Sequence, residues 1–232
     1  MLSAVKTYAL IVAAGRAVRF GGAVPKQFRE VCGRPLLSWT ISRFEQAASI
    51  DAIAVVVAEE HLLYTSQKVV DPYGFTKVRK IVVGGETRRE SVLRGLKAIP
   101  ISTRVVAIHD GARPLTKSSD IDRVVKTAQA ERAAMLAIPA TDTVKRVREG
   151  YVLGTLERDS LYLAQTPQVF DFDLILEAHQ KAGADVAASD DASLVEARGF
   201  KVRIVEPSAP NVKVTNADDL AIVEALLKQE AM

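Results

Sequence analysis

The chain has 232 residues, of which 48% are hydrophobic and 25% charged, and its formal net charge is +3. This length can bury a sizeable core, whereas the small net charge and the lack of a basic, aromatic-interleaved stripe argue against a nucleic-acid-binding protein. The single cysteine, Cys32, excludes an internal disulfide, and no apolar stretch is long enough to cross a bilayer. We expect a cytoplasmic protein with one domain over residues 1–232, no nucleic-acid partner and no membrane segment.

The first predicted strand, residues 8–14, is an apolar run that ends abruptly at Gly15. A small-residue loop with Arg16 and Arg19 follows, and Pro25-Lys26-Gln27 closes it. Small residues let backbone N–H groups approach an anion closely, and cations neutralise phosphate charge. The loop is therefore a candidate phosphate cradle, in which Pro25 stiffens the backbone before Lys26. An ordinary strand-to-helix loop with solvated arginines is the alternative.

Two common phosphate motifs are absent from this loop. Ala17 and Phe20 stand where the second and third glycines of a dinucleotide fingerprint would fall. No Gly-Lys-Ser/Thr follows Gly15, so the Walker pattern is absent as well.

Further apolar, β-branched runs alternate with segments of helical period. The next predicted strands are 52–58, 78–83, 105–109, 135–139 and 201–205. Most are near-continuous apolar stretches, which is typical of a parallel sheet covered on both faces. Helices are predicted from Pro35 as a first helical residue, after a capping box at Thr87–Glu90, and over 216–230. The alternation predicts right-handed crossovers and an α/β fold with a doubly wound, mostly parallel sheet.

One region breaks this alternation. Residues 141–165 contain two short strand-like pieces, 143–147 and 151–156, joined by a Glu149-Gly150 turn. A hairpin with no core of its own is marginal in water. We therefore expect a projecting β-hairpin arm that leaves the sheet and packs on something else.

The loops at the carboxyl ends of the predicted strands are the expected ligand site of an open parallel sheet. These loops are 15–26, 84–88, 109–114, 140–143 and 211–215. Each has a purely structural alternative: Gly84-Gly85 as a turn, His109 as a core-edge histidine, Asp110 as a helix cap and Lys213 as a solvated charge. Together they offer cations, glycines and one carboxylate, without a nucleophile–base pair or clustered metal ligands. That set suits phosphoryl or nucleotidyl transfer.

Motifs along almost the whole chain closely resemble those of the 2-C-methyl-D-erythritol 4-phosphate cytidylyltransferase family. They are Ala13-Ala14-Gly15 with Arg19, Pro25-Lys26-Gln27, Gly84-Gly85, Arg88 with Ser91-Val92, His109-Asp110-Gly111-Ala112-Arg113-Pro114, Asp142-Thr143-Val144-Lys145, Arg158, Gln165-Thr166-Pro167-Gln168 and Asn211-Val212-Lys213-Val214-Thr215. The opening loop alone indicates only the broader class of sugar nucleotidyltransferases. The Thr-Pro-Gln and Lys-Val-Thr elements are far more specific.

The resemblance implies a Rossmann-like nucleotidyltransferase of non-mevalonate isoprenoid synthesis, in which the phosphate of 2-C-methyl-D-erythritol 4-phosphate attacks the α-phosphorus of CTP and pyrophosphate leaves. The implied catalytic residues are Arg19, Lys26, Arg158 and Lys213. The implied nucleotide-binding residues are Ala13, Ala14, Gly15, Gly84, Gly85, Ser91 and Asp110. The implied acceptor-binding residues are Asp110, Arg113, Thr143, Arg158, Thr166 and Lys213.

The resemblance also implies a divalent cation and a partner. Mg²⁺ or another divalent cation would be held mainly by the CTP phosphates, with no protein ligand assigned. Family members are homodimers whose arms reach into the neighbour's site. This matches the unsupported hairpin, which follows from the sequence pattern independently.

One position departs from the family pattern. Ala17 stands where the family loop usually has a second glycine. If that position needs a positive φ, alanine costs about 1 kcal/mol there, which would change how the loop closes over the nucleotide.

Two other functions remain open at this stage. One is a cytidylyltransferase for another polyol phosphate, such as ribitol 5-phosphate. The other is a non-catalytic nucleotide-binding protein on the same fold. Retention of both Arg19 and Lys26 argues against the second, because a pure binder does not need two cations at the α-phosphate.

Overall fold

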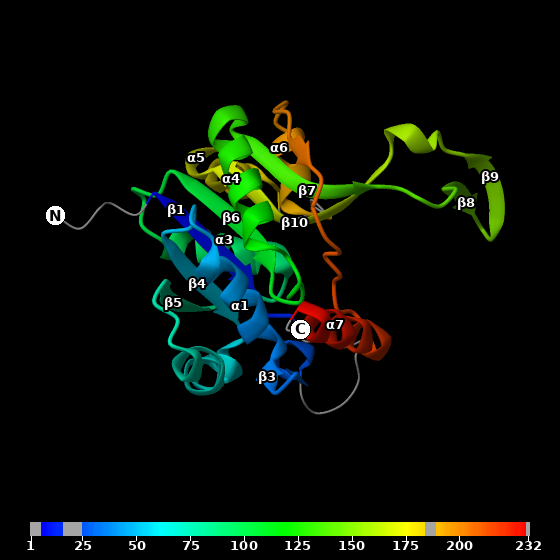
Figure 1. Cartoon of the computed structure of the whole chain (residues 1–232). Helices are drawn as coiled ribbons and strands as arrows, with labels where there is room; N and C mark the ends of the chain where they lie inside the picture. The colour runs from blue at the N-terminus through cyan, green and yellow to red at the C-terminus, as the bar shows by residue number, and fades with distance from the viewer. Residues whose placement is uncertain (1–5, 16–24, 184–188, 231–232) are drawn as a thin grey trace.

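The computed structural model describes residues 6–15, 25–183 and 189–230. Its centre is a seven-stranded sheet in the order β11-β7-β10-β6-β1-β4-β5 (Figure 1). The strands are β1 (Thr7–Val12), β4 (Ala52–Val57), β5 (Val78–Val83), β6 (Val105–Asp110), β7 (Ala133–Pro139), β10 (Tyr162–Asp171) and β11 (Arg203–Val205). Neighbouring strands are parallel except where β10 pairs antiparallel with β6 and β7. The predicted α/β fold with a mostly parallel sheet is confirmed.

All six predicted strands are present, with ends that differ by a few residues. The first ends at Val12, and the last begins at Arg203. Strand β10 is not among the predicted strands; it carries Thr166-Pro167 and shifts register against β7 between Ala164 and Gln168. Proline has no N–H to give to a central ladder, so its presence hides this strand in the sequence.

Helices cover both faces of the sheet, as a doubly wound fold requires (Figure 1). α1 (Leu36–Gln46) and α4 (Ser118–Glu131) pack on one face, and α3 (Arg88–Ala98), α5 (Phe172–Lys181) and α6 (Asp191–Glu196) pack on the other. Alternate strand residues feed the two cores: in β1, Ala9 and Ile11 face the first, and Tyr8 and Leu10 face the second. Both faces are buried, which explains the near-continuous apolar strands.

The predicted helix starts are close to those observed. The Thr87 hydroxyl accepts the N–H of Glu90 at 3.1 Å, as a capping box requires. The Glu90 carboxylate, however, accepts from the backbone of Glu86 at 2.8 Å and not from Thr87. Pro35 directly precedes the first residue of α1 and does not occupy it.

The remaining elements are short or peripheral. They are η2 (Lys26–Phe28), β2 (Glu30–Val31), β3 (Arg34–Pro35), η3 (Glu59–His61), α2 (Leu62–Tyr64), η4 (Thr65–Val70), η5 (Asp71–Tyr73), η6 (Arg158–Ser160) and α7 (Ala217–Glu230). α7 covers a small third cluster that contains Val31 and Val214. Among the described helices, none combines the length and apolarity that a membrane span needs.

The predicted hairpin is present and projects from the body of the molecule (Figure 1). It consists of β8 (Lys145–Arg148) and β9 (Tyr151–Thr155), which pair antiparallel. Glu149 and Gly150 have φ values of 51° and 84°, the two positive angles of a type I′ turn. Both strands are exposed along their whole length, so this chain gives the hairpin no core.

Candidate functional site

A cavity of about 570 Å³ lies beyond the carboxyl ends of β1, β4, β5 and β6. This volume is within the usual range for small-molecule sites. Its walls come from the loops that follow these strands, from the Lys26-Gln27 segment and from Lys213. The sheet edge predicted from the sequence is therefore where the structure forms its cavity.

Small residues form one wall of the cavity. A Cβ atom built on Gly84 would lie 2.4 Å from the Cβ of Ala14 and 2.9 Å from the Ser91 hydroxyl. The loops after β1 and β5 therefore approach closely because position 84 has no side chain. The Ser91 hydroxyl accepts the N–H of Gly85 at 3.0 Å and donates to the carbonyl of Thr87 at 2.9 Å. The predicted nucleotide-binding residues Ala13, Ala14, Gly15, Gly84, Gly85 and Ser91 all line the cavity.

Lys26 and Gln27 hold the closing end of the first loop. The Gln27 amide donates to the carbonyls of Ala13 at 2.9 Å and Gly15 at 3.3 Å. The Lys26 ammonium donates to the carbonyl of Val214 at 2.7 Å, so the first loop is tied to the segment that carries Lys213. Arg19, the other predicted cation, and Ala17 lie outside the described residues.

Asp110 is the charge centre of the site. Its carboxylate is 2.7 Å from the Lys213 ammonium, 3.3 Å from Arg88 Nε and 3.8 Å from Arg113 Nε. Burial alone would raise the pKa of this carboxyl, but Arg88, Lys213 and Arg113 together hold the pKa well below its ordinary value. Asp110 is therefore ionised and offsets part of the surrounding positive charge.

Thr166 and His109 fix the backbone at Asp110 through hydrogen bonds. The Thr166 hydroxyl accepts the N–H of Asp110 at 3.1 Å and lies 3.0 Å from His109 Nδ1. His109 Nε2 lies 3.1 Å from the carbonyl of Arg113, which can only accept, so Nε2 carries the ring hydrogen and Nδ1 accepts from Thr166. Burial lowers the pKa of His109 to about 4. A neutral, fully buried histidine thus orients the loop, which agrees with the interpretation of His109 as a core-edge histidine.

Asn211 connects the last loop to this arrangement. Its side-chain amide donates to the Gln165 side chain at 3.0 Å and to the Thr166 carbonyl at 2.9 Å. Its backbone carbonyl accepts from Arg113 at 2.7 Å. Arg113 and Thr166 are both buried, and the hydroxyl of Thr166 is already engaged within the chain.

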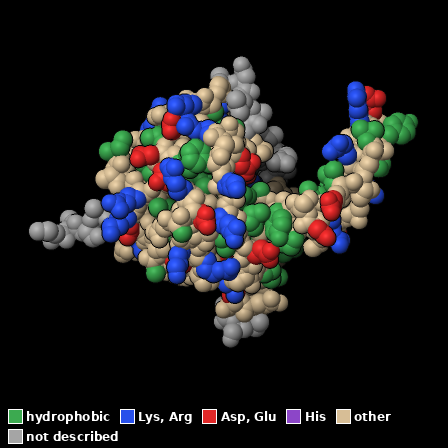
Figure 2. Space-filling view, turned by 90° about the horizontal axis from the view of Figure 1, so that it is seen from above, with side chains coloured by type: hydrophobic (Ala, Val, Ile, Leu, Met, Phe, Trp, Pro, Cys, Tyr) green, Lys and Arg blue, Asp and Glu red, His purple; other side chains and the backbone are tan. Residues whose placement is uncertain are grey.

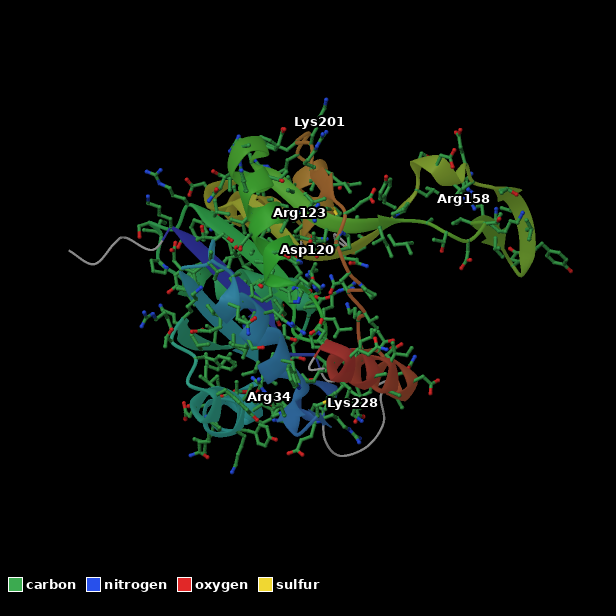
Figure 3. The ribbon with its side chains drawn as sticks, in the orientation of Figure 1. Arg34, Asp120, Arg123, Arg158, Lys201 and Lys228 are labelled. Carbon is green, nitrogen blue, oxygen red and sulfur yellow. The ribbon has the colours of Figure 1, made fainter. Side chains whose placement is uncertain are left out.

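Thr143 and Arg158 are not brought to the cavity by this chain. Arg158 lies on the arm, away from the body of the molecule (Figure 3), and donates to the carbonyl of Thr141 at 3.0 Å. Thr143 is exposed at the base of the same arm. The single chain therefore assembles Lys26, Asp110, Arg113, Thr166 and Lys213 at one sheet edge, with these two residues left outside.

The described residues do not fit a protein-held metal site. Over 6–15, 25–183 and 189–230, no three or more His, Cys, Asp or Glu side chains are grouped to hold a metal ion. Both Asp110 oxygens already face cations, Oδ1 toward Arg88 and Oδ2 toward Lys213. A metal ion brought to this carboxylate would meet repulsion from these neighbouring cations.

Sequence reasoning missed several residues of the site. Arg88 was noted only as part of a motif, and its ion pairs with Asp110 and Asp191 carry no local signal. Arg94, which also lines the cavity and donates to the Gly84 carbonyl at 2.7 Å, was not singled out. The Pro-Lys-Gln pattern could have indicated a role for Gln27, because a buried amide beside a glycine loop needs backbone partners.

Comparisons with known proteins agree over nearly the whole chain. A model of the 2-C-methyl-D-erythritol 4-phosphate cytidylyltransferase family matches residues 7–229. A relative of that name from Geotalea uraniireducens (strain Rf4) is 44% identical over 223 residues, covering 95% of this chain and 96% of the relative. The crystal structure of 4-diphosphocytidyl-2C-methyl-D-erythritol synthase from Anaerococcus prevotii DSM 20548 is similar, with a TM-score of 0.84, 29% identity and 96% of each chain covered. The crystal structure of the cytidylyltransferase from Thermus thermophilus has a TM-score of 0.76, 36% identity and coverage of 96% of this chain and 99% of that one.

Proposed function

The chain belongs to the 2-C-methyl-D-erythritol 4-phosphate cytidylyltransferase family, and we propose from this premise how its cavity transfers CMP from CTP to that polyol phosphate. An acceptor phosphate oxygen attacks the α-phosphorus of CTP and forms the new P–O bond. The bond from the α-phosphorus to the bridging oxygen breaks, and pyrophosphate leaves with the electron pair. The product is 4-diphosphocytidyl-2-C-methyl-D-erythritol, which the non-mevalonate route to isoprenoids consumes. The observation that carries the proposal is one cavity with Lys26, Lys213 and Asp110 beside a small-residue wall.

The nucleotide occupies the side of the cavity formed by the loops after β1 and β5. The pyrimidine lies against Ala13, Ala14, Gly84, Gly85 and Ser91, where the absence of a Gly84 side chain lets the two loops approach closely. Lys26 and Arg19 neutralise the charge that grows on the α-phosphate as the bonds exchange. No general base is needed, because the attacking phosphate is already an anion at neutral pH.

The acceptor occupies the side of the cavity near Lys213. Lys213 remains 41% exposed while its ammonium rests on Asp110, so it can turn to an arriving phosphate. The Asp110 carboxylate is proposed to accept hydrogen bonds from the polyol hydroxyls, and Arg113 adds positive charge beside it. In this chain Thr166 acts through its hydrogen bonds to Asp110 and His109.

Arg158 and Thr143 complete the acceptor site of a second subunit. The arm is exposed and apolar on part of its surface (Figure 2), a surface that a partner would cover. Its exposed apolar side chains are Val147, Tyr151, Val152, Leu153 and Leu163. We infer a homodimer in which each arm reaches the other subunit's cavity.

Mg²⁺ or another divalent cation enters with CTP as part of the substrate. The cation would be bound by the triphosphate oxygens, since the described side chains form no cluster of three or more metal ligands.

The test is pyrophosphate release with each of the four nucleoside triphosphates and with two acceptors, 2-C-methyl-D-erythritol 4-phosphate and ribitol 5-phosphate. The proposal expects release with CTP and the methylerythritol phosphate. Preference for ribitol 5-phosphate would reassign the acceptor, and CTP binding without release would indicate a non-catalytic protein.

A further inference from the structure

We propose that Asp191 and His179 are positioning residues for the transfer reaction, which act through Arg88 on the Asp110–Lys213 pair. Neither residue lines the cavity. The inference rests on the proposed function, because it takes Lys213 as the group that meets the acceptor phosphate.

Arg88 is shared between two carboxylates. Its Nε donates to Asp110 at 3.3 Å, and its Nη2 donates to Asp191 at 2.7 Å. Arg88 is the first residue of α3, Asp191 the first residue of α6, and Asp110 the last residue of β6. One guanidinium therefore fixes three elements to each other at the edge of the cavity, with the geometric specificity of charge-assisted hydrogen bonds.

Asp191 is itself held by a buried histidine. Its second oxygen lies 3.1 Å from His179 Nε2, and both side chains are almost completely buried. A carboxylate can only accept, so Nε2 carries the ring hydrogen. Burial alone would raise the pKa of Asp191, but Arg88 and His179 hold the pKa below its ordinary value. Asp191 is thus an ionised carboxylate with one oxygen for each partner.

A buried charge of this kind is costly as a purely structural contact. Removing a carboxylate from water is strongly unfavourable before its partners compensate. Apolar side chains already join α3, α5 and α6 in one core cluster, which includes Val92, Ala178 and Val195. The ionised Asp191 is therefore explained better by what it does to Arg88 than by packing.

The effect on the reaction follows from the charges around Asp110. Arg88, Arg113 and Lys213 all face this one carboxylate. While Asp191 holds the far side of Arg88, the guanidinium contacts only Oδ1, and Oδ2 stays with Lys213. Without that anchor, Arg88 is free to turn fully onto Asp110 and compete with Lys213, which would displace the ammonium that the acceptor phosphate meets.

The experiment compares Asp191→Asn with the wild type in pyrophosphate release, varying each substrate at saturation of the other. We expect kcat/KM for the acceptor to fall on the order of tenfold or more, because small misplacements of a reacting group are costly. KM for CTP should stay within about twofold, since the nucleotide wall is untouched. Asp191→Glu should restore most of the loss. His179→Ala should lower the same parameter, and His179→Gln, which keeps an N–H donor, should recover much of it.

Asp190 gives a matched control. It neighbours Asp191 and caps α6 by accepting the N–H of Ser193 at 3.0 Å, but its ties run to Ser193 and Gln168. Asp190→Asn makes the same change one residue earlier and tests whether the loss of any carboxylate at the start of α6 is enough to produce the effect. We expect acceptor kinetics close to wild type.

A double variant tests the route of action. If Asp191 acts through Arg88, then Asp191→Asn causes no further loss in an Arg88→Lys background. Additive losses, an unchanged acceptor kcat/KM in Asp191→Asn, or equal losses in Asp190→Asn would each overturn the inference. A wild-type protein that releases no pyrophosphate would instead overturn the proposed function, and the inference with it.

Discussion

The Lys213 ammonium lies 2.7 Å from the Asp110 carboxylate, yet 41% of the Lys213 side chain is exposed against 12% for Asp110. The pair is thus asymmetric: a buried anion held by several cations supports one cation that remains accessible from the cavity. Such a lysine is oriented before substrate arrives, which reduces the entropy that binding must overcome. The charge relationships around Asp110 lead to the predictions that follow.

Lys26→Ala should reduce turnover by roughly 10²–10³, the scale of removing one group that stabilises transition-state charge. The affinity for CTP should fall much less. Steady-state kinetics with CTP varied would measure both, and Lys126→Ala, an exposed lysine on α4, is the control. A raised KM for CTP with turnover intact would make Lys26 a ground-state binder.

Gly84→Ala should weaken CTP binding about tenfold, in line with the 1–3 kcal/mol typical of overpacking. The new Cβ would stand 2.4 Å from the Cβ of Ala14, so the two loops of the nucleotide wall must separate. Calorimetric titration with CTP measures the effect, and a single cooperative thermal transition, at a lower melting temperature, would show that the fold is intact. Adding Ala14→Gly should recover part of the affinity, because it removes the closest contact and leaves the 2.9 Å contact with the Ser91 hydroxyl. A double variant as weak as the single one would contradict this explanation.

The sequence predicted the sheet edge and most residues on it, because each strand ends in a loop with its own local signal. Asp110 and Gly84 directly follow recognisable apolar runs, and Lys26 closes the loop that follows another. Strand β10 was missed because Thr166-Pro167 lies in its middle, where the register shifts. Asp191 and His179 were missed for a different reason: they reach the site through Arg88 from helices on one face of the sheet. Contacts between side chains so distant in sequence leave no pattern that periodicity detects.

Mg²⁺ should bind weakly to the protein without nucleotide. Both oxygens of Asp110 already face cations, and the described side chains form no cluster of three or more metal ligands. Isothermal titration of the nucleotide-free protein with MgCl₂ should show no tight site, while CTP should bind more strongly when Mg²⁺ is present. A tight metal site in the nucleotide-free protein would refute this view.

The unfolding free energy should fall as the pH is lowered from about 6.5 to about 4, because of His109. Its ordinary pKa is near 6.5, and burial lowers the folded value to about 4. Between these values the unfolded chain binds a proton that the folded chain does not, so stability is lost with decreasing pH, by roughly 3 kcal/mol in total. The carboxyls of Asp110 and Asp191, whose pKa values are lowered, add their loss only below about pH 4. Urea unfolding at pH 7, 6 and 5 measures the slope. His109→Gln should reduce it, and an unchanged slope would assign the titration to another group.

Mixed dimers test whether Arg158 and Lys213 belong to one site shared by two subunits. Arg158 lies on the arm, held to Thr141 of its own chain (Figure 3), and the apolar arm residues have no core within that chain. A partner would bring the guanidinium beside the Lys213 ammonium, and two adjacent cations favour a doubly charged phosphate.

Arg158→Ala and Lys213→Ala homodimers should each be nearly inactive. After subunit exchange, a heterodimer should regain one working site, because one of its two sites inherits both intact residues. Native mass spectrometry confirms exchange, and mixing two preparations of the same variant is the control. If exchange is complete and activity is not restored, both residues serve the cavity of a single subunit, and the prediction of a shared site is wrong.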